Sequence, residues 1–203
     1  MEALQIISLA LGAAWAGGVN IYAVVLFLGG LGAVGIIDLP GELDVLSNPA
    51  VLITAGVIYI VEFFADKIPG IDSLWDAIHT FVRIPAGALL AAGAVTEIGE
   101  PYQVVAALLL GGAVAASSHA TKAGARAAIN TSPEPFSNWA ASIAEDVLVV
   151  GGLSLALFSP MVFFGVFLLF IVFALWLLPK LWRILRRLIT RLSSGGASNE
   201  TVL

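Results

Sequence analysis

Long apolar stretches alternate with short polar segments along the chain, a pattern that is typical of a membrane protein with several helical spans. The first apolar stretch covers residues 3–36 and is interrupted only by Gln5, Ser8 and Asn20. As one α-helix, its 34 residues would be about 51 Å long, well over the roughly 30 Å of bilayer hydrocarbon. This segment must therefore tilt, break or lie partly in the interface, and Gly17-Gly18 followed by Asn20 marks the predicted break.

Five further segments follow the first one. They cover residues 49–64, 72–95, 102–130, 137–158 and 161–178. Because a helical span takes about 20 residues, the pattern predicts an all-α, polytopic membrane helix bundle of about six transmembrane helices, of which the first is broken. We expect one transmembrane domain over residues 1–192, followed by a disordered tail over residues 193–203, which are mostly small and polar.

Part of the sequence recurs after a shift of 64 residues. The residues that match across the shift are Pro69, Ser73 and Trp75 with Pro133, Ser137 and Trp139. A two-helix internal repeat explains these matches, and its two copies would run parallel because they lie two crossings apart. The alternative is a pair of unrelated helices with similar starts, since Pro followed by Ser or Asp often begins a helix.

Composition agrees with a location in the membrane. Hydrophobic residues make up 60% of the chain and charged residues 11%, and the mean hydropathy is +1.02. A soluble domain carries about 25% charged residues. The chain has no cysteine, which excludes disulfides, thiolate nucleophiles and iron–sulfur clusters. Six spans would use nearly the whole length, so no room remains for a separate soluble catalytic domain.

The positions of the nine Lys and Arg residues predict an orientation. With the N-terminus inside and six crossings, all nine lie on the inner side, and the outer loops at residues 37–48, 97–101 and 159–160 contain carboxylates but no cation. The positive-inside rule then predicts a multi-pass protein of the cell (inner or plasma) membrane with its C-terminus in the cytoplasm. If the break at Gly17-Gly18 is a hairpin, the N-terminus moves outside and the other five spans keep their places.

Polar side chains inside the predicted spans are the candidates for function. A charged group at mid-bilayer costs about 2.5–3.5 kcal/mol on insertion scales, so it usually faces the bundle interior and has a partner. The groups that we assign to a substrate or ion pathway are Asn20, Glu62, Asp66, Asp76, His79, Arg83, Lys122, Arg126, Asn138, Glu145 and Asp146. Two alternatives remain open: structural ion pairs, and, for groups near the interface such as Lys67 and Asp72, direct contact with water.

Two motifs resemble those of a known family. They are Glu-Phe-Phe-Ala-Asp-Lys-Ile-Pro, which begins at Glu62, and Ser-Pro-Glu-Pro-Phe-Ser-Asn-Trp, which begins at Ser132. Together with Gly-x-Asn-x-Tyr at Gly18, they make the chain similar to an uncharacterised, mainly bacterial family of integral membrane proteins of about 200 residues, known as a domain of unknown function. The resemblance covers essentially the whole chain. It implies a small, single-domain, multi-pass protein, and it implies no substrate.

The sequence favours a transporter or channel for a small solute or ion, with a polar pathway between spans two to five. Discontinuous helices form binding sites in many transporters. One alternative is a non-catalytic membrane assembly or scaffold subunit. Another is a metal-dependent enzyme for lipid head groups that uses Asp72, Asp76 and His79 on one helix face.

Catalytic sequence signatures are absent from the chain. We therefore assign no catalytic residue, favour a protein that is not an enzyme, and expect no cofactor. Whether a metal binds stays open. The expected partners are membrane lipids and a small solute or ion, without nucleic acid, and the sequence does not determine the oligomeric state.

Overall fold

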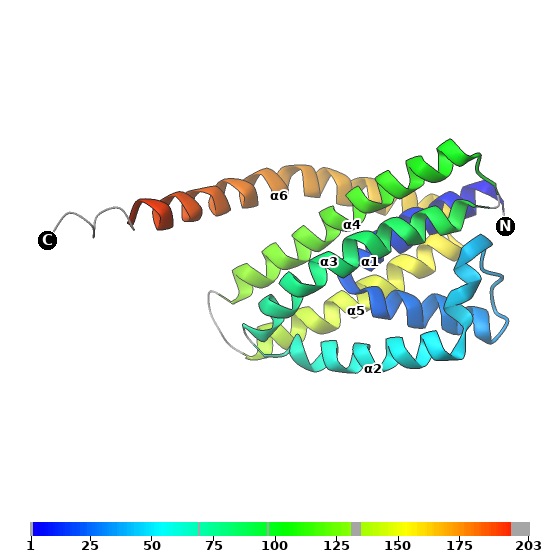
Figure 1. Ribbon diagram of the computed structural model, residues 1–203, viewed down its shortest axis with the longest axis horizontal. Coiled ribbons are helices and arrows are strands. Elements are labelled where there is room, and N and C mark those ends of the chain that lie inside the picture. Colours follow the sequence, from blue (N-terminus) through cyan, green and yellow to red (C-terminus); the bar gives the residue numbers. More distant parts are fainter. Residues whose placement is uncertain (1, 69, 97, 131–134, 196–203) are drawn as a thin grey trace, which may run out of the picture.

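The computed structural model describes residues 2–68, 70–96, 98–130 and 135–195, and these residues form a helical bundle (Figure 1). Its elements are α1 (Ala3–Ala33), the 3-10 helix η1 (Gly41–Ser47), α2 (Pro49–Ala65), α3 (Ile71–Val95), α4 (Pro101–Ile129), α5 (Pro135–Phe158) and α6 (Pro160–Gly195). Within this described part, five helices are long and apolar enough to cross a membrane, and η1 with α2, bent by 69°, forms a sixth candidate. The predicted polytopic bundle of about six helices is confirmed.

Two predictions concern residues that the structure describes only in part. Pro69 and Pro133 of the proposed repeat lie outside the described residues, and the two-helix repeat therefore stays a prediction. α6 continues through Gly195, so its last residues extend past the expected domain boundary at residue 192. The remainder of the expected tail lies outside the described residues.

The first helix is interrupted at Asn20. The backbone of Asn20 is extended (φ −151°, ψ 98°) between two helical parts. The Asn20 side chain caps the second part, because its Oδ1 accepts a hydrogen bond of 3.0 Å from the backbone N–H of Ala23. The predicted break in the first segment is therefore confirmed, and the residue that makes it is Asn20.

The two parts of α1 run in opposite directions and form a hairpin (Figure 1). The first part runs antiparallel to α3: Ala3 and Ile7 share a cavity with Ile98 and Gly99, which follow the end of α3. The second part runs parallel to α3, and its Gly29 packs on Leu46 of η1. η1 itself contacts the end of α3, where Leu43 faces Gly93. Both ends of α1 thus lie at one end of the bundle.

The hairpin changes the topology that we predicted for an N-terminus inside. The N-terminus lies at the end of the bundle that holds Asp38, Glu42, Asp44 and Glu100, which we call the acidic end. Lys67 and the end of α4 lie at the opposite end, which we call the basic end (Figure 1). The hairpin alternative is the one observed, and the reason is the extended backbone at Asn20, which a kinked but continuous helix would not need.

α1 is the central element of the bundle and contacts η1 and all five other helices. In its most apolar window of 18 residues, 67% of the residues are buried, against 11% in α6. Small residues allow the close packing: a Cβ atom added to Gly18 would overlap the backbone carbonyl of Ala115 in α4, and one added to Gly87 in α3 would overlap the Ala115 side chain. The central position of α1 places the break at Asn20 inside the bundle.

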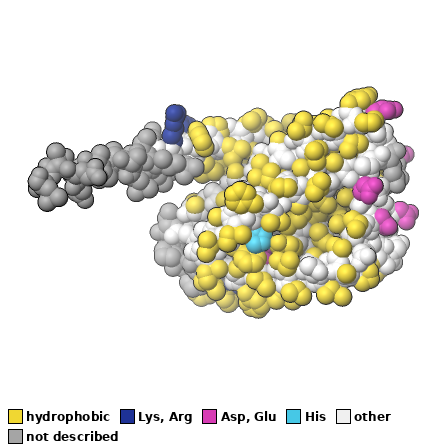
Figure 2. Space-filling view, in the orientation of Figure 1, with side chains coloured by type: hydrophobic (Ala, Val, Ile, Leu, Met, Phe, Trp, Pro, Cys, Tyr) yellow, Lys and Arg dark blue, Asp and Glu magenta, His cyan; other side chains and the backbone are white. Residues whose placement is uncertain are grey.

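The surface agrees with a membrane location. Figure 2 shows hydrophobic side chains over most of the visible described surface, acidic groups at the acidic end and basic groups on α6. Large apolar side chains are exposed along the middle of the helices, for example Phe81 (84% exposed), Leu109 (69%) and Leu175 (71%). In water such a surface would aggregate, whereas lipid tails cover it favourably. The chain is a multi-pass membrane protein.

The hairpin can be tested by labelling, because the chain has no native cysteine. We expect a membrane-impermeant maleimide to label Glu2→Cys and Asp44→Cys from the same side of the membrane and Arg183→Cys from the other. All three side chains are exposed. Labelling of Glu2→Cys and Arg183→Cys from one side would contradict the hairpin.

Because α1 and α4 approach closely at Gly18, one added methyl group there should destabilise the protein. Gly18→Ala should lower the free energy of unfolding in detergent by about 1–3 kcal/mol, because the new Cβ atom meets backbone that cannot move aside easily. Gly151→Ala in α5 is the matched control, since its Cβ atom would meet nothing within 4 Å. Equal stability of the two variants would show that this contact is not tightly packed.

Candidate functional site

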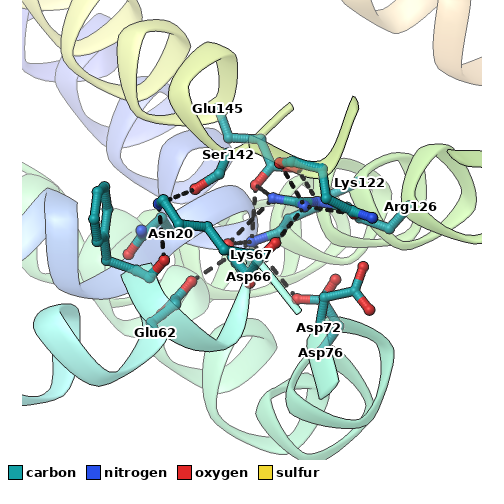
Figure 3. Close-up of polar contacts among 12 residues, drawn as sticks. Asn20, Glu62, Asp66, Lys67, Asp72, Asp76, Lys122, Arg126, Ser142 and Glu145 are labelled. Atoms are coloured by element: carbon teal, nitrogen blue, oxygen red, sulfur yellow. Dashed lines mark hydrogen bonds and ion pairs between the residues drawn. The ribbon is translucent and has the colours of Figure 1, made fainter. Parts of the chain in front are cut away.

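Seven charged side chains of the described residues form one continuous network of ion pairs between α2, α3, α4 and α5 (Figure 3). We call this group the ion-pair network. Its cations are Arg83, Lys122 and Arg126, and its carboxylates are Glu62, Asp66, Asp76 and Glu145. The paired groups lie about one turn apart at the end of α2 and in α4 and about two turns apart in α3, so each pair shares one helix face, and α5 supplies Glu145.

Lys122 lies at the centre of the ion-pair network. Its Nζ atom is 3.2 Å from Glu145 Oε2, 3.4 Å from Asp66 Oδ2, 3.5 Å from Glu62 Oε1 and 3.6 Å from Asp76 Oδ1. All four carboxylates therefore share one ammonium group. The Lys122 side chain is 1% exposed, so only these groups and the protein backbone replace its lost hydration.

The two arginines hold the carboxylates in pairs. Arg83 donates to Glu62 Oε1 at 2.6 Å and to Asp76 Oδ1 at 2.7 Å. Arg126 donates to both oxygens of Glu145 at 2.8 Å, a bidentate geometry, and lies 3.3 Å from Asp66 Oδ2. Both guanidinium groups are fully buried. A cation at this depth is stable only because several acceptors surround it.

The ion-pair network is not fully balanced. Its described members are three cations and four carboxylates, so in the fully ionised form it carries one surplus negative charge. Three buried carboxylate oxygens in this part of the chain also lack a hydrogen-bond partner: Glu62 Oε2, Asp66 Oδ1 and Asp76 Oδ2. Buried polar atoms without partners are rare in folded proteins and often mark functional sites.

The break in α1 lies directly against this network. The backbone carbonyl of Val19, at the end of the first helical part, accepts a hydrogen bond of 3.1 Å from Lys122 Nζ. At the start of the second part, the Asn20 side chain lies 3.4 Å from Asp146 Oδ1. A cation thus meets the negative end of one helix dipole and a carboxylate meets the positive end of the other. Tyr59 also donates to Asp146, at 2.8 Å.

The other two predicted pathway residues have different surroundings. Asn138 is fully buried, and its Oδ1 accepts from Arg126 Nη1 at 3.2 Å. His79 lies apart from the ion-pair network: its ring nitrogens face the Trp75 carbonyl at 2.9 Å and the Tyr22 hydroxyl at 3.1 Å. The structure therefore brings together all the predicted residues except His79.

The sequence left open that Asp72 contacts water directly, but in the structure this side chain is buried. Its side chain is 0% exposed, and its carboxylate accepts from the backbone N–H groups of Gly70 and Ser73 and from the Asn130 side chain. It caps the start of α3. The prediction missed Asn130 as a partner, although it lies one turn beyond Arg126 on the same face of α4.

Asp66, a member of the ion-pair network, and the neighbouring Lys67 lie just past the end of α2, outside the helical spans. Burial, together with the neighbouring Glu62 and Glu145 carboxylates, raises the pKa of Asp66 to about 6, although the charges of Lys122 and Arg126 act to lower it. Burial lowers the pKa of Lys67, whereas Asp146 and Asp66 raise it. Asp66 therefore exchanges its proton nearer to neutral pH than an exposed aspartate does.

A small cleft connects the ion-pair network with the basic end of the bundle. Its volume is about 210 Å³, and it lies between α3 and α4. The polar groups on its walls are Ser73, Asp76, Thr80 and His119, and alanines line the remainder. The prediction did not include His119, although the residue lies three positions before Lys122 on α4.

The residues proposed for a metal-dependent enzyme do not converge. Asp72 binds Asn130, Asp76 binds Arg83, and His79 binds Trp75 and Tyr22. In the described residues, no three His, Asp or Glu side chains are arranged so that they could hold a metal ion.

The fold and the site define a polytopic α-helical membrane protein with a broken helix and a buried ion-pair network. A family model described as "Domain of unknown function (DUF4126)" matches residues 7–180, and the chain belongs to this family. The predicted resemblance to an uncharacterised family is thus confirmed. No match to the chain was found among curated proteins or among solved structures.

The ion pair between Glu62 and Arg83 predicts that the effects of these two residues on the free energy of unfolding are coupled. Arg83→Gln should lower the free energy of unfolding by about 3–5 kcal/mol, because it removes a shared cation from the buried carboxylates of Glu62 and Asp76, whereas Glu62→Gln should lower it by less, because Arg83 keeps Asp76 as a partner. The loss of unfolding free energy in the double variant should be smaller than the sum of the two single losses, by at least about 1 kcal/mol. Denaturation in mixed micelles measures these values.

The control for this cycle uses two exposed charges at opposite ends of the bundle, Asp38→Asn and Arg183→Gln. Their effects should be small and add within about 0.5 kcal/mol. Additive losses in the Glu62 and Arg83 cycle would contradict a direct ion pair.

Proposed function

We propose that this protein is a transporter of a small solute or ion, and that the ion-pair network and the break in α1 form its binding site in a closed state. The observation behind the proposal is the contact of the broken helix with buried charges: Lys122 binds the Val19 carbonyl, and Asn20 faces Asp146. Many transporters bind substrate and coupling ions at half-helix ends within the membrane.

The imbalance of the ion-pair network also supports transport. A network that serves only stability gains from pairing every buried group, since an unpaired charge in the interior is strongly destabilising. In the described residues the surplus carboxylate and the three oxygens without partners depart from that expectation. These groups are available to a cation, and the cleft at Asp76 and His119 offers a polar route to them.

The distribution of charge supports an orientation. The basic end and the C-terminus face the cytoplasm of a cell (inner or plasma) membrane, as the positive-inside rule requires. The hairpin in α1 then places the N-terminus outside. The cleft between α3 and α4 opens toward the cytoplasm in this orientation.

A scaffold or assembly subunit is the second candidate function. The observation in its favour is the number of partners in the ion-pair network: each of the cations Arg83, Lys122 and Arg126 pairs with two or more carboxylates. Such a network can stabilise helix packing without any ligand. A flux measurement separates the two functions, because only a transporter moves a solute.

If the protein is a transporter, liposomes that contain the purified protein should show flux of its substrate. We expect wild-type protein to move at least one of H⁺, Na⁺, K⁺ or a small organic solute across the bilayer. Asp146→Asn should lower that flux at least about tenfold, because it removes a charge at the broken helix and leaves the seven members of the ion-pair network in place. Flux is measured with ion-sensitive dyes or radiolabelled solutes.

Asp38→Asn, an exposed change at the acidic end, is the matched control and should behave as wild type. No wild-type flux for any of these solutes would reject transport and leave the scaffold candidate. Equal flux of Asp146→Asn and wild type would place the pathway elsewhere.

A further inference from the structure

We propose that the ion taken up by this site is a proton, and that it enters through the cleft between α3 and α4 with His119 as its first acceptor. This inference rests on the proposed transport function and specifies its ion and its entry route. It is carried by the hydrogen bonds of His119, by the shape of the cleft and by the charge of the ion-pair network.

The cleft has the dimensions of a water-filled entry. A water molecule occupies about 30 Å³ in the liquid, so 210 Å³ has room for about seven. Ser73, Ala77 and Ala127 line it and are exposed close to the basic end, whereas Asp76 and His119 line it and are buried. The cleft therefore leads from the surface to two titratable groups.

The partners of His119 determine which ring nitrogen carries the hydrogen. Arg83 Nη1 lies 3.3 Å from His119 Nδ1, and a guanidinium group can only donate, so Nδ1 accepts. The hydrogen of the neutral ring is then on Nε2, which donates to Thr80 Oγ1 at 2.7 Å. Thr80 in turn donates to the Asp76 carbonyl at 3.0 Å. In this arrangement His119 is neutral, and its unprotonated nitrogen Nδ1 faces Arg83.

A proton that binds at Nδ1 changes these contacts. A new N–H bond forms at Nδ1, and the hydrogen bond from Arg83 breaks because the imidazolium has no acceptor left. The charged groups that face the ring are Arg83 and Asp76 from α3 and Lys122 from α4, and from α1 the backbone of Gly18 offers the ring a hydrogen-bond acceptor. The two nearby cations repel an imidazolium, so the proton is passed on.

Asp76 is the next acceptor on this route. It lines the cleft beside His119, and its Oδ2 has no hydrogen-bond partner. Transfer breaks the N–H bond of the imidazolium and forms an O–H bond on the carboxyl group, which leaves His119 neutral again. One proton balances the surplus charge of the described ion-pair network, whose three cations face four carboxylates.

A proton assay in liposomes tests the inference. Purified full-length protein is reconstituted with a pH-sensitive dye inside, and a K⁺ gradient with valinomycin provides the driving force. We expect wild-type protein to move protons. His119→Gln should lower the rate at least about tenfold, because glutamine can accept from Arg83 and donate to Thr80 but does not titrate in this range. Asp38→Asn is the control and should retain wild-type flux, since Asp38 is exposed at the acidic end and does not line the cleft.

A second pair of variants tests the cleft without touching the hydrogen bonds of His119. Ala127→Leu fills the exposed part of the cleft and should also lower proton flux, whereas Ala125→Leu, an exposed residue of α4 that does not line the cleft, should not. If His119→Gln fails to fold, these two variants still test whether protons enter through the cleft.

The outcomes separate this inference from the proposed function. Flux of another ion or solute without proton movement would overturn the inference and leave transport standing. Absence of every flux would overturn both. Proton flux in His119→Gln and Ala127→Leu equal to that of wild type would overturn the entry route.

Discussion

The cost of holding charges away from water is the constraint on which this structure depends. Bilayer and bundle interior offer Arg83, Lys122 and Arg126 no bulk water, and each would be strongly destabilising alone. Four carboxylates from α2 and its C-cap, α3 and α5 meet these cations, and Lys122 contacts all four. The helices that carry the charges are therefore held in one register, because a shift of one turn would separate the pairs.

The break in α1 joins the fold to the site. Gly18 lets α1 approach α4 closely, and this approach brings the Val19 carbonyl within reach of Lys122. The extended backbone at Asn20 leaves helix-end groups without their usual partners, and the neighbouring charges satisfy them. Packing and electrostatics support each other here, so the break costs little stability.

The same network has features that stability does not require. Its surplus carboxylate, its described oxygens without partners and the cleft at His119 all lie toward the basic end. A fully paired network would hold the helices as well and would be inert. The proposed transport function assigns this imbalance to the uptake of a cation, which a scaffold would not need.

Hydropathy and composition by themselves determined the spans, the break near Asn20 and the set of polar groups inside the membrane, because bilayer thickness and the cost of charge act on each segment separately. Only the tertiary structure decided that α1 turns back, that Asp72 is buried against Asn130, and that His119 rather than His79 lies beside Arg83. These features depend on how each helix is rotated and how closely it packs. Spacing along the sequence places residues on a helix face, but it does not say which helix that face meets.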